Sequence, residues 1–373
     1  MIKIKEVLTK NEQIEFVNFP LELYKGNPYY VPCLYSDEMA IFKKDYYYND
    51  QSKSIFFLAY MENKIVGRIQ GIIQFNANKK YNQKRARFTR FDSINNQDVA
   101  NALFKAVENW AKENQMDEIV GPLGYSDLER EGLLIEGFDQ LSTFCEQYSY
   151  SYYQHLIENY KFEKEVDWLE RRLFLPEEIN PKIEEVSKKM LKKYNLHHGE
   201  AKNTKDFLNK YGEQFFDILD KTYDKLYQTV PLTDKVRKNL IKSFNLIINL
   251  DYVGVIVDEN DKVVCFGLCF PSIAKEVNRC KGKLNLISIL RILKTIKKPE
   301  TIELALIGVI PEYQNKGIST AILDRLIKML QNKNVKYAET NLTLEDNHSV
   351  QNQWKHFESV IHKRRRCYIK KID

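Results

Sequence analysis

One segment of the chain constrains its fold more than any other: an apolar stretch, then a polar loop, then a second apolar stretch. Apart from Glu303, residues 302–310 carry no polar side chain, which is typical of a strand buried on both faces. Pro311 ends this strand because it has no N–H to donate to a neighbour. Residues 318–330 then have the apolar spacing of a helix. The segment therefore predicts strand, loop and helix in succession.

The loop itself, residues 314–320 (Gln-Asn-Lys-Gly-Ile-Ser-Thr), has the composition of an anion-binding site. The first amides of a helix have no partner within the helix and carry partial positive charge, so they bind phosphate readily. Gly317 lets a ligand approach the backbone closely. Ser319 and Thr320 add hydroxyl donors, and Lys316 adds charge. We therefore predict a phosphate site at the start of this helix.

Strands and helices alternate along the rest of the chain, and its two halves resemble each other. Residues 57–68 and 255–266 form similar predicted hairpins, and each is followed by strand, helix, strand and helix. We interpret this as a tandem duplication of one α/β unit, with domains at residues 1–175 and 176–373. The predicted helices are 12–23, 97–113, 150–160, 182–194, 207–226, 234–250, 284–296, 318–330 and 349–357, and the main predicted strands are 2–7, 55–60, 64–73, 87–91, 253–257, 262–270, 302–310, 337–344 and 360–372.

The loop motif Gln314-x-x-Gly317-x-Ser319, placed after a buried strand, resembles the signature of the GNAT superfamily of N-acetyltransferases, Gln/Arg-x-x-Gly-x-Gly/Ala. Serine replaces glycine or alanine at the last position and is also small. The resemblance implies an α/β (α+β) fold of two GNAT-like units, each a mixed, mostly antiparallel sheet flanked by helices. It also implies acetyl-coenzyme A as co-substrate, with its pyrophosphate on the loop.

The resemblance carries cofactor-binding roles onto particular residues. In the family, a strand splayed from the first one leaves a gap for the pantetheine, and here that strand is 337–344. Trp354 stands where many members carry a tyrosine that protonates the leaving thiolate. The residues implied to contact coenzyme A are Ile307, Gly308, Val309, Gln314, Asn315, Lys316, Gly317, Ile318, Ser319, Thr320 and Asn347.

Glu303 is the candidate general base, because it is the one charged side chain inside the strand 302–310 and lies eleven residues before Gln314. An amine must lose a proton before it attacks a thioester, and a carboxylate or an ordered water can accept that proton. Histone-type members of the family carry a catalytic glutamate at a comparable point. The alternative is that Glu303 only begins the strand at a solvated edge.

The first half lacks a phosphate loop, since residues 92–98 (Asp-Ser-Ile-Asn-Asn-Gln-Asp) contain no Gln/Arg-x-x-Gly and two aspartates would repel pyrophosphate. We therefore expect this half to shape the acceptor site. Its glycine-containing loops 121–124 and 132–138 are either parts of that site or ordinary connections.

Two basic segments have open interpretations. The helix 284–296 has an apolar stripe of Leu286, Ile289, Leu290, Leu293 and Ile296 flanked by lysines and arginine. We expect it to pack by that stripe with a solvated basic face, the alternatives being a membrane-surface helix or a lid on the acceptor site. The cluster Lys363–Arg366 is expected on a solvated edge strand, with contact to the 3′-phosphate of coenzyme A as the alternative.

Composition excludes several classes of protein. Net charge is only +6, from 57 basic and 51 acidic residues, so no nucleic-acid partner is expected. The six cysteines include no C-x-x-C pair, so we expect buried free thiols such as Cys265 and Cys269 and no metal site. No apolar run approaches the ~20 residues of a membrane span. A cytoplasmic protein is expected, and a homodimer is left open.

The sequence thus predicts an acyl-CoA-dependent N-acyltransferase that moves an acetyl group directly to a small-molecule or peptide amine, with both substrates bound together. The alternatives are a non-catalytic coenzyme A-binding or regulatory module, and an aminoacyl or long-acyl transferase on a doubled GNAT fold.

Overall fold

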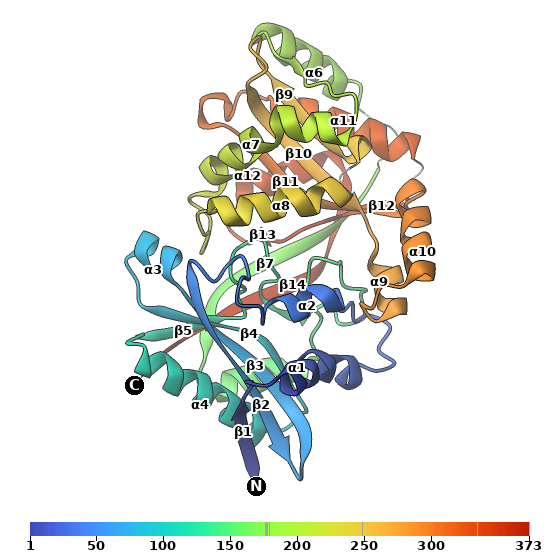
Figure 1. Ribbon diagram of the computed structural model, residues 1–373. Helices are drawn as coiled ribbons and strands as arrows, with labels where there is room; N and C mark the ends of the chain where they lie inside the picture. The colour runs from blue at the N-terminus through green and yellow to red at the C-terminus, as the bar shows by residue number, and fades with distance from the viewer. Residues whose placement is uncertain (176–177, 179, 248, 334, 373) are drawn as a thin grey trace.

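The computed structural model describes residues 1–175, 178, 180–247, 249–333 and 335–372. Its fourteen described strands form one twisted sheet that runs through both halves of the chain (Figure 1). The strand order is β1-β2-β3-β4-β5-β14-β7-β12-β11-β10-β9-β8, with β6 on β14 and β13 on β7. The pairs β4–β5 and β11–β12 are parallel, and the other pairs are antiparallel. The predicted fold class, a mixed and mostly antiparallel sheet flanked by helices, is confirmed.

The strands are β1 (Ile2–Glu6), β2 (Ser52–Met61), β3 (Lys64–Gln74), β4 (Arg85–Ser93), β5 (Glu118–Gly121), β6 (Leu133–Glu136), β7 (Glu163–Phe174), β8 (His197–His198), β9 (Val253–Val257), β10 (Val263–Pro271), β11 (Thr301–Val309), β12 (Tyr337–Thr340), β13 (Thr343–Leu344) and β14 (Glu358–Lys371). The α-helices are α1 (Lys10–Leu23), α2 (Tyr35–Ala40), α3 (Phe75–Tyr81), α4 (Gln97–Glu113), α5 (Tyr152–Asn159), α6 (Lys182–Lys193), α7 (Thr204–Tyr223), α8 (Asp234–Ile247), α9 (Ala274–Cys280), α10 (Leu286–Lys297), α11 (Ser319–Asn332) and α12 (His348–Gln353). Short 3-10 turns lie at Leu250–Tyr252, Pro311–Tyr313 and Trp354–His356.

The long predicted elements are confirmed, and α4 has the predicted bounds, 97–113. The predicted strand 337–344 is instead divided, because the chain leaves β11 after Thr340 and pairs with β7 as β13. Helices α2, α3 and α9 are not apparent in the sequence pattern, since six or seven residues are too short to establish a helical period.

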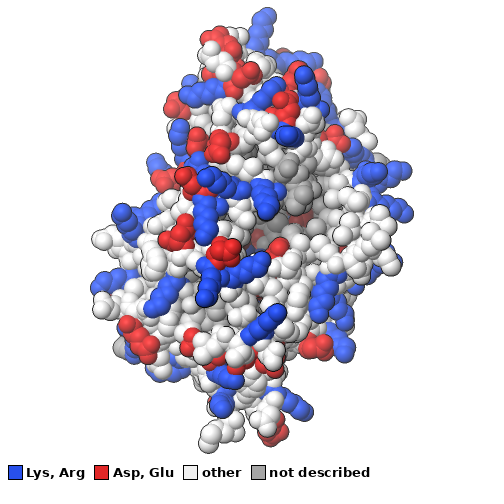
Figure 2. All heavy atoms as spheres, viewed as in Figure 1, with Lys and Arg blue, Asp and Glu red and all other residues white. Residues whose placement is uncertain are grey.

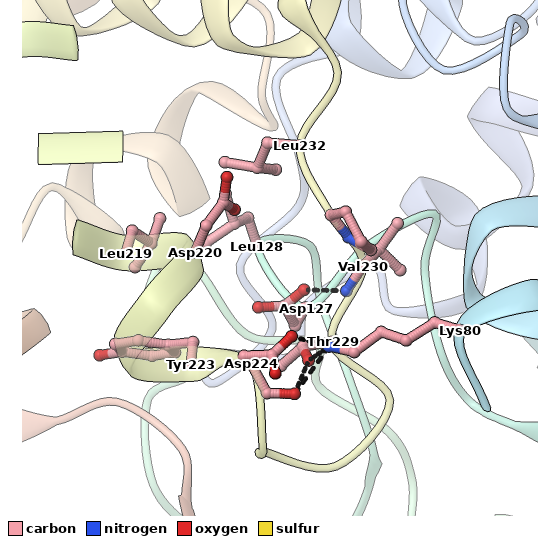
Figure 3. A pocket seen from close by; sticks show the side chains of 11 residues that line it. Lys80, Asp127, Leu128, Leu219, Asp220, Tyr223, Asp224, Thr229, Val230 and Leu232 are labelled. Atoms are coloured by element: carbon pink, nitrogen blue, oxygen red, sulfur yellow. Dashed lines mark hydrogen bonds and ion pairs between the residues drawn. The ribbon is translucent and has the colours of Figure 1, made fainter. Parts of the chain in front are cut away.

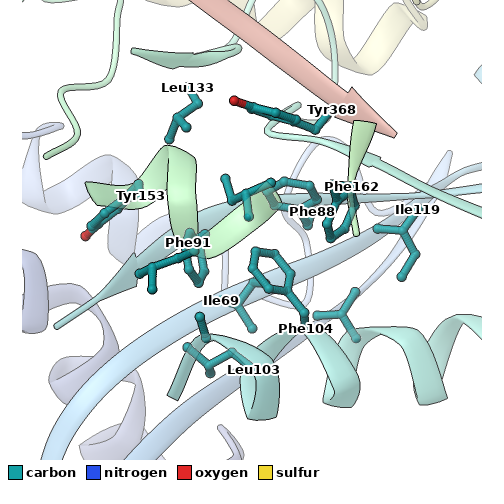
Figure 4. Close-up of a cluster of buried hydrophobic side chains, with 14 of the residues drawn as sticks. Ile69, Phe88, Phe91, Leu103, Phe104, Ile119, Leu133, Tyr153, Phe162 and Tyr368 are labelled. Atoms are coloured by element: carbon teal, nitrogen blue, oxygen red, sulfur yellow. The ribbon is translucent and has the colours of Figure 1, made fainter. Parts of the chain in front are cut away.

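Aromatic rings fill the core of the first half, where α4 lies across the sheet (Figure 4). Phe104 of α4 packs its ring 5.3 Å from that of Phe88 and 4.5 Å from that of Phe91. The tyrosines 148, 150, 152 and 153 pack in or against this core.

Two helices cover opposite faces of the sheet in the second half. Phe266 of β10 packs on Phe215 of α7, with ring centroids 4.4 Å apart. The next residue, Gly267, faces Ile322 of α11. Consecutive residues of a strand point to opposite faces, so β10 is enclosed between the two helices. Cys265 and Cys269 of the same strand are buried free thiols, as predicted.

The two halves exchange strands at the middle of the sheet, where β7 and β14 lie side by side between them (Figure 1). β14 is the last strand of the chain, yet it pairs with β5, and its Tyr368 lies in the core of the first half. β7 pairs with β12, and its Leu173 lies in a core with Ile302. The division at residues 175 and 176 stays a prediction, and the sheet continues across it.

Helix α10 lies at the outer edge of the molecule (Figure 1), and the expectation that it packs by its apolar stripe is wrong. Leu286, Ile289, Leu290 and Leu293 are all exposed. The alternation of apolar and polar residues shows that a helix is amphipathic, but not which side faces the protein. Within the part of the chain that the structure describes, no helix is long and apolar enough to cross a membrane.

Candidate active site

The candidate site begins where β11 and β12 separate. The two parallel strands pair from Thr301 with Tyr337 to Leu304 with Thr340. The last bond between them is donated by the Asn341 amide to the Leu304 carbonyl at 2.9 Å. Beyond that point β11 continues along β10 alone among the described strands. One edge of β11 is therefore open from Ala305 to Val309, which is the splay that the sequence resemblance implies.

A β-bulge in β11, at the start of the open edge, changes which backbone groups face β10. Leu268 of β10 pairs with Leu306 and Cys269 pairs with Leu304, so Ala305 is the extra residue. Further along, the Ile310 amide donates to the Val264 carbonyl at 3.0 Å. Because bonded and non-bonded pairs alternate in antiparallel strands, the backbone groups of Ile307 and Val309 point away from β10. They face the gap beside β12.

Tyr223, at the end of α7, lies against this edge. Its hydroxyl oxygen is 3.1 Å from the Ile307 carbonyl oxygen and 3.3 Å from the Ile307 nitrogen. Burial raises the pKa of the Tyr223 phenol to about 12, so the hydroxyl keeps its proton near neutral pH. No sequence signal indicates this residue, because its contact is 84 positions away along the chain.

The first half holds the loop that follows Tyr223. Lys80 donates to the Asp224 carbonyl and the Thr229 hydroxyl at 2.7 and 2.9 Å. Asp127 accepts from the Val230 amide at 3.0 Å. These groups surround a cavity of ≈ 110 Å³, and the Tyr223 hydroxyl points away from its Lys80 side (Figure 3). The buried Arg87 also donates to the carbonyl and side-chain oxygens of Gln228. The first half thereby positions the end of α7.

The predicted phosphate loop follows β11 directly. Among the described residues, no group accepts a hydrogen bond from the backbone amides of residues 315–319. Asn315 and Gly317 have positive φ angles, 59° and 75°, which turn consecutive amides toward a common side. No side chain caps the first turn of α11. A run of unpaired amides at a helix start suits a diphosphate.

The corresponding helix of the first half is capped by its own chain. The Asn96 side chain accepts from the amides of Asp98 and Val99 at 2.9 and 3.2 Å. These amides are therefore occupied, in contrast to those at the start of α11. The absence of a phosphate site in the first half stays a prediction.

The other residues implied to contact coenzyme A lie on β11, on the loop that follows it or at the start of α11, apart from Asn347. Lys316 lies over the rings of Tyr194 and Tyr313, 5.4 and 5.3 Å from their centroids. A side chain at Gly308 would meet the Phe266 ring at 2.5 Å, so only glycine fits there. Asn347 caps α12, and its side-chain oxygen accepts from the Val350 amide at 3.3 Å. Its role toward coenzyme A stays a prediction.

Glu303 is buried, one residue before the strands separate. Its Oε1 accepts from the Ser272 hydroxyl at 2.6 Å and from the Phe144 amide at 3.4 Å. Burial raises the pKa of this carboxyl to about 7, with a further increase from the charge of Glu339, while the Ser272 hydrogen bond acts in the opposite direction. The alternative of a solvated strand edge is excluded by this burial.

A row of buried charges continues from Glu303 across the sheet. Glu339 lies beside it on β12 and pairs with Arg172 of β7 at 2.9 Å. Lys363 of β14 pairs with Glu170 of β7 at 2.8 Å. The expectation that Lys363–Arg366 occupies a solvated edge is wrong, because β14 is a central strand. Lys363 and Arg365 are fully buried and both bind Glu170.

A larger cavity of ≈ 820 Å³ reaches Phe144, a residue in contact with Glu303. Phe144 and Cys145 form part of its wall, and Phe144 is also the residue whose amide contacts Glu303. Lys235 and Lys238 of α8 line another part. This volume is in the range of small-molecule sites. The cavity is therefore lined by residues of both halves, and one of them, Phe144, contacts the candidate base.

Two further sequence predictions concern Trp354 and metals. Trp354 is buried in the core of the second half, and its indole nitrogen has no hydrogen-bond partner in the described part of the chain. It therefore serves as a core residue in this structure. The described residues include no cluster of three or more His, Cys, Asp or Glu side chains arranged to hold a metal ion.

Comparisons with known proteins agree with this geometry. A model of the acetyltransferase (GNAT) family matches residues 213–357. The chain is 25% identical to the protein YghO of Escherichia coli (strain K12), over 99% of this chain and 95% of that protein. It is 24% identical to the bacterial ceramide synthase of Caulobacter vibrioides (strain NA1000 / CB15N), over 76% and 73% of the two chains.

Solved structures show the same doubled fold. A tandem GNAT protein from the clavulanic acid biosynthesis pathway matches 100% of this chain and 99% of its own, with a TM-score of 0.56 at 11% identity. The glucosamine N-acetyltransferase region of a fungal multi-domain β-N-acetylglucosaminidase has a TM-score of 0.57, also at 11% identity, over 99% of this chain and 38% of that one. Residues 213–357 therefore match the GNAT acetyltransferase family, and the chain as a whole has the fold of tandem GNAT proteins.

Proposed function

We propose that this protein transfers an acyl group from acyl-coenzyme A to an amine acceptor while both are bound. Bound coenzyme A supplies an activated thioester. The observation that carries the proposal is the position of Glu303, a buried carboxyl with a pKa of about 7. It lies one residue before the point where β11 and β12 separate, and it accepts a hydrogen bond from Phe144, which lines the ≈ 820 Å³ cavity. A base of this pKa is suited to accept a proton near neutral pH.

Each part of the site has a role in this proposal. The free amides of residues 315–319 hold the diphosphate, and the open edge at Ile307 and Val309 holds the pantetheine arm. Glu303 removes a proton from the amine, directly or through one water. Tyr223, whose hydroxyl already contacts Ile307, protonates the leaving thiolate in place of the hydroxyl that Trp354 lacks.

The sequence leads us to expect that an acetyl group is transferred. A longer acyl group or a lipid amine acceptor is the second candidate. The likeness to the bacterial ceramide synthase is matched by a cavity that is large for a small amine. The second candidate function is therefore N-acylation of a long-chain amine.

A two-stage experiment tests the proposal. Thermal-shift titrations with acetyl-CoA and palmitoyl-CoA first measure cofactor binding, and stabilisation by either is expected because a ligand stabilises the folded state it binds. Release of free thiol is then measured with amino sugars, polyamines and long-chain amino alcohols. Binding without thiol release on any acceptor would favour a non-catalytic coenzyme A-binding module. No binding of either thioester would contradict the proposal.

A further inference from the structure

We propose that α10 is a docking helix that seats the protein on a bilayer surface carrying anionic headgroups. Its large apolar side chains are displayed rather than packed: Leu286 is 74% exposed, Ile287 62% and Leu290 59%. Leu284, Ile289 and Leu293 are exposed as well. Twelve exposed large hydrophobic residues are found in the described part of the chain, and six of them lie within the ten positions from Leu284 to Leu293. Such a concentration of exposed apolar side chains marks an interaction surface.

The side of α10 that faces the protein is different. Ser288 is buried, and Ile292, Thr295 and Ile296 are half-buried. These residues follow helical spacing, so they form one side of the helix. The exposed leucines lie on the other side, where α10 forms the edge of the molecule in Figure 1. The helix is thus attached by a narrow face and presents its wider apolar face outward.

Basic residues accompany this face without acidic partners. From Lys281 to Lys298 the chain has five lysines, one arginine and no acidic residue. None of Arg291, Lys294, Lys297 and Lys298 forms an ion pair among the described residues. In Figure 2, uncharged side chains bordered by Lys and Arg occupy the edge where α10 lies. Basic and apolar side chains on one exposed face are typical of interfacial helices.

The placement of the charges favours a bilayer over a second copy of the chain. Lys297 lies four residues after Leu293 and seven after Leu290, so it emerges within the apolar face. Two such faces packed together would bring like charges into contact. At a bilayer, the lysine stem lies along apolar chains while the ammonium reaches the headgroups, and anionic lipids attract it.

The segment that leads into helix α10 reaches the large cavity. Lys281 and Tyr35 line that cavity, the Tyr35 amide donates to the Gly282 carbonyl at 2.9 Å, and the Lys283 ammonium lies 4.7 Å from the centroid of the Tyr35 ring. Docking through α10 would bring this wall of the cavity close to lipid headgroups. Vesicle binding does not depend on the proposed acyl transfer, so the two proposals can fail separately.

The test is co-flotation of the full chain with vesicles of phosphatidylcholine mixed with phosphatidylglycerol, and with vesicles of phosphatidylcholine alone. We expect binding to the mixed vesicles that weakens with added salt. Leu286→Ser/Leu290→Ser/Leu293→Ser and, separately, Arg291→Gln/Lys294→Gln/Lys297→Gln should each reduce binding at least tenfold. Because these side chains are exposed, the melting temperature should change little.

Control variants remove side chains of the same kinds at other exposed positions. Leu8→Ser/Phe75→Ser removes exposed apolar side chains outside α10, and Lys205→Gln/Lys221→Gln/Lys262→Gln removes three charges from other exposed positions. Both should bind the vesicles as the wild type does. Wild-type chain that does not float with the mixed vesicles would overturn the proposal. So would a concentration-dependent dimer, seen by sedimentation without vesicles and abolished by the leucine substitutions, because α10 would then bind a second copy.

Discussion

The Ser272 hydroxyl donates a hydrogen bond to Glu303, with 2.6 Å between Oγ and Oε1. This bond favours the ionised carboxylate, whereas burial favours the protonated acid and is the larger effect. The balance leaves the pKa of Glu303 at about 7, where a general base is most effective near neutral pH.

Removing this hydrogen bond should move the pH dependence of turnover. In Ser272→Ala the carboxylate loses a donor, so the pKa of Glu303 rises and the acidic limb of the kcat profile shifts to higher pH. Glu303→Gln should lower kcat by about 10²–10⁴-fold and abolish that limb, with acyl-CoA affinity retained. An acidic limb that is unchanged in Glu303→Gln would remove this residue as the base.

The same pKa shift predicts a pH dependence of stability. The folded protein keeps the Glu303 proton up to about pH 7, whereas an unfolded glutamate loses it near its ordinary pKa of 4.5. The folded state therefore binds more protons between these values, so this group makes stability fall as pH rises through that window. Glu303→Gln should remove this contribution. Urea unfolding measures both proteins at pH 5 and pH 7.5. The free energy of unfolding of the variant, relative to that of the wild type, should be higher at pH 7.5 than at pH 5.

The phosphate loop can be tested by charge. Gly317→Glu places a carboxylate among the free amides of residues 315–319, and it should weaken acyl-CoA binding at least tenfold by repulsion and by obstruction. Asn315→Gly is the matched control, because it keeps the amides and glycine accepts the positive φ of this position. Isothermal titration with acetyl-CoA measures both. Equal affinity of Gly317→Glu and wild type would contradict the phosphate site.

Tyr223→Phe removes the hydroxyl that contacts Ile307. Loss of a proton donor should lower kcat by about 10²-fold while acyl-CoA affinity changes little. Tyr81→Phe is the control, since the Tyr81 hydroxyl bonds the Leu226 carbonyl on the same loop without touching Ile307. Single-turnover kinetics should show a slow chemical step only in Tyr223→Phe. Equal rates for the two variants would assign Tyr223 a structural role.

The buried ion pair between Lys363 and Glu170 should contribute to the free energy of unfolding, so that loss of one partner destabilises the protein. Lys363→Met deprives Glu170 of one of its two cationic partners inside the sheet, which should cost about 3–5 kcal/mol. The double variant Lys363→Met/Glu170→Gln should recover part of that loss, because the side chain that lost one of its two cationic partners is then neutral. Urea unfolding measures both. A cost below ~1 kcal/mol for the single variant, as for a surface pair, would contradict this assignment.

Local features of the chain determined the central part of the site. The apolar run 302–310, Pro311 and Gly317 lie within fewer than twenty residues. Each affects the structure locally, through its own side chain or backbone. The strand, the loop and the helix start are therefore readable from sequence, and so is Glu303 as the one charge within the strand. The similar hairpins of the two halves likewise indicated the doubled fold, since each half repeats one local pattern.

Long-range contacts decided the rest. The basic run Lys363–Arg366 is buried because β14 inserts between β5 and β7, and its own sequence resembles an edge strand. The stripe of α10 has the same period whether it faces the core or solvent, so only packing by Ser288 and Ile292 reveals that it faces outward. Tyr223 reaches Ile307 across 84 residues. The sequence by itself therefore determines the local elements and the chemical groups they carry. The exchange of strands between the two halves determines which of these groups come into contact.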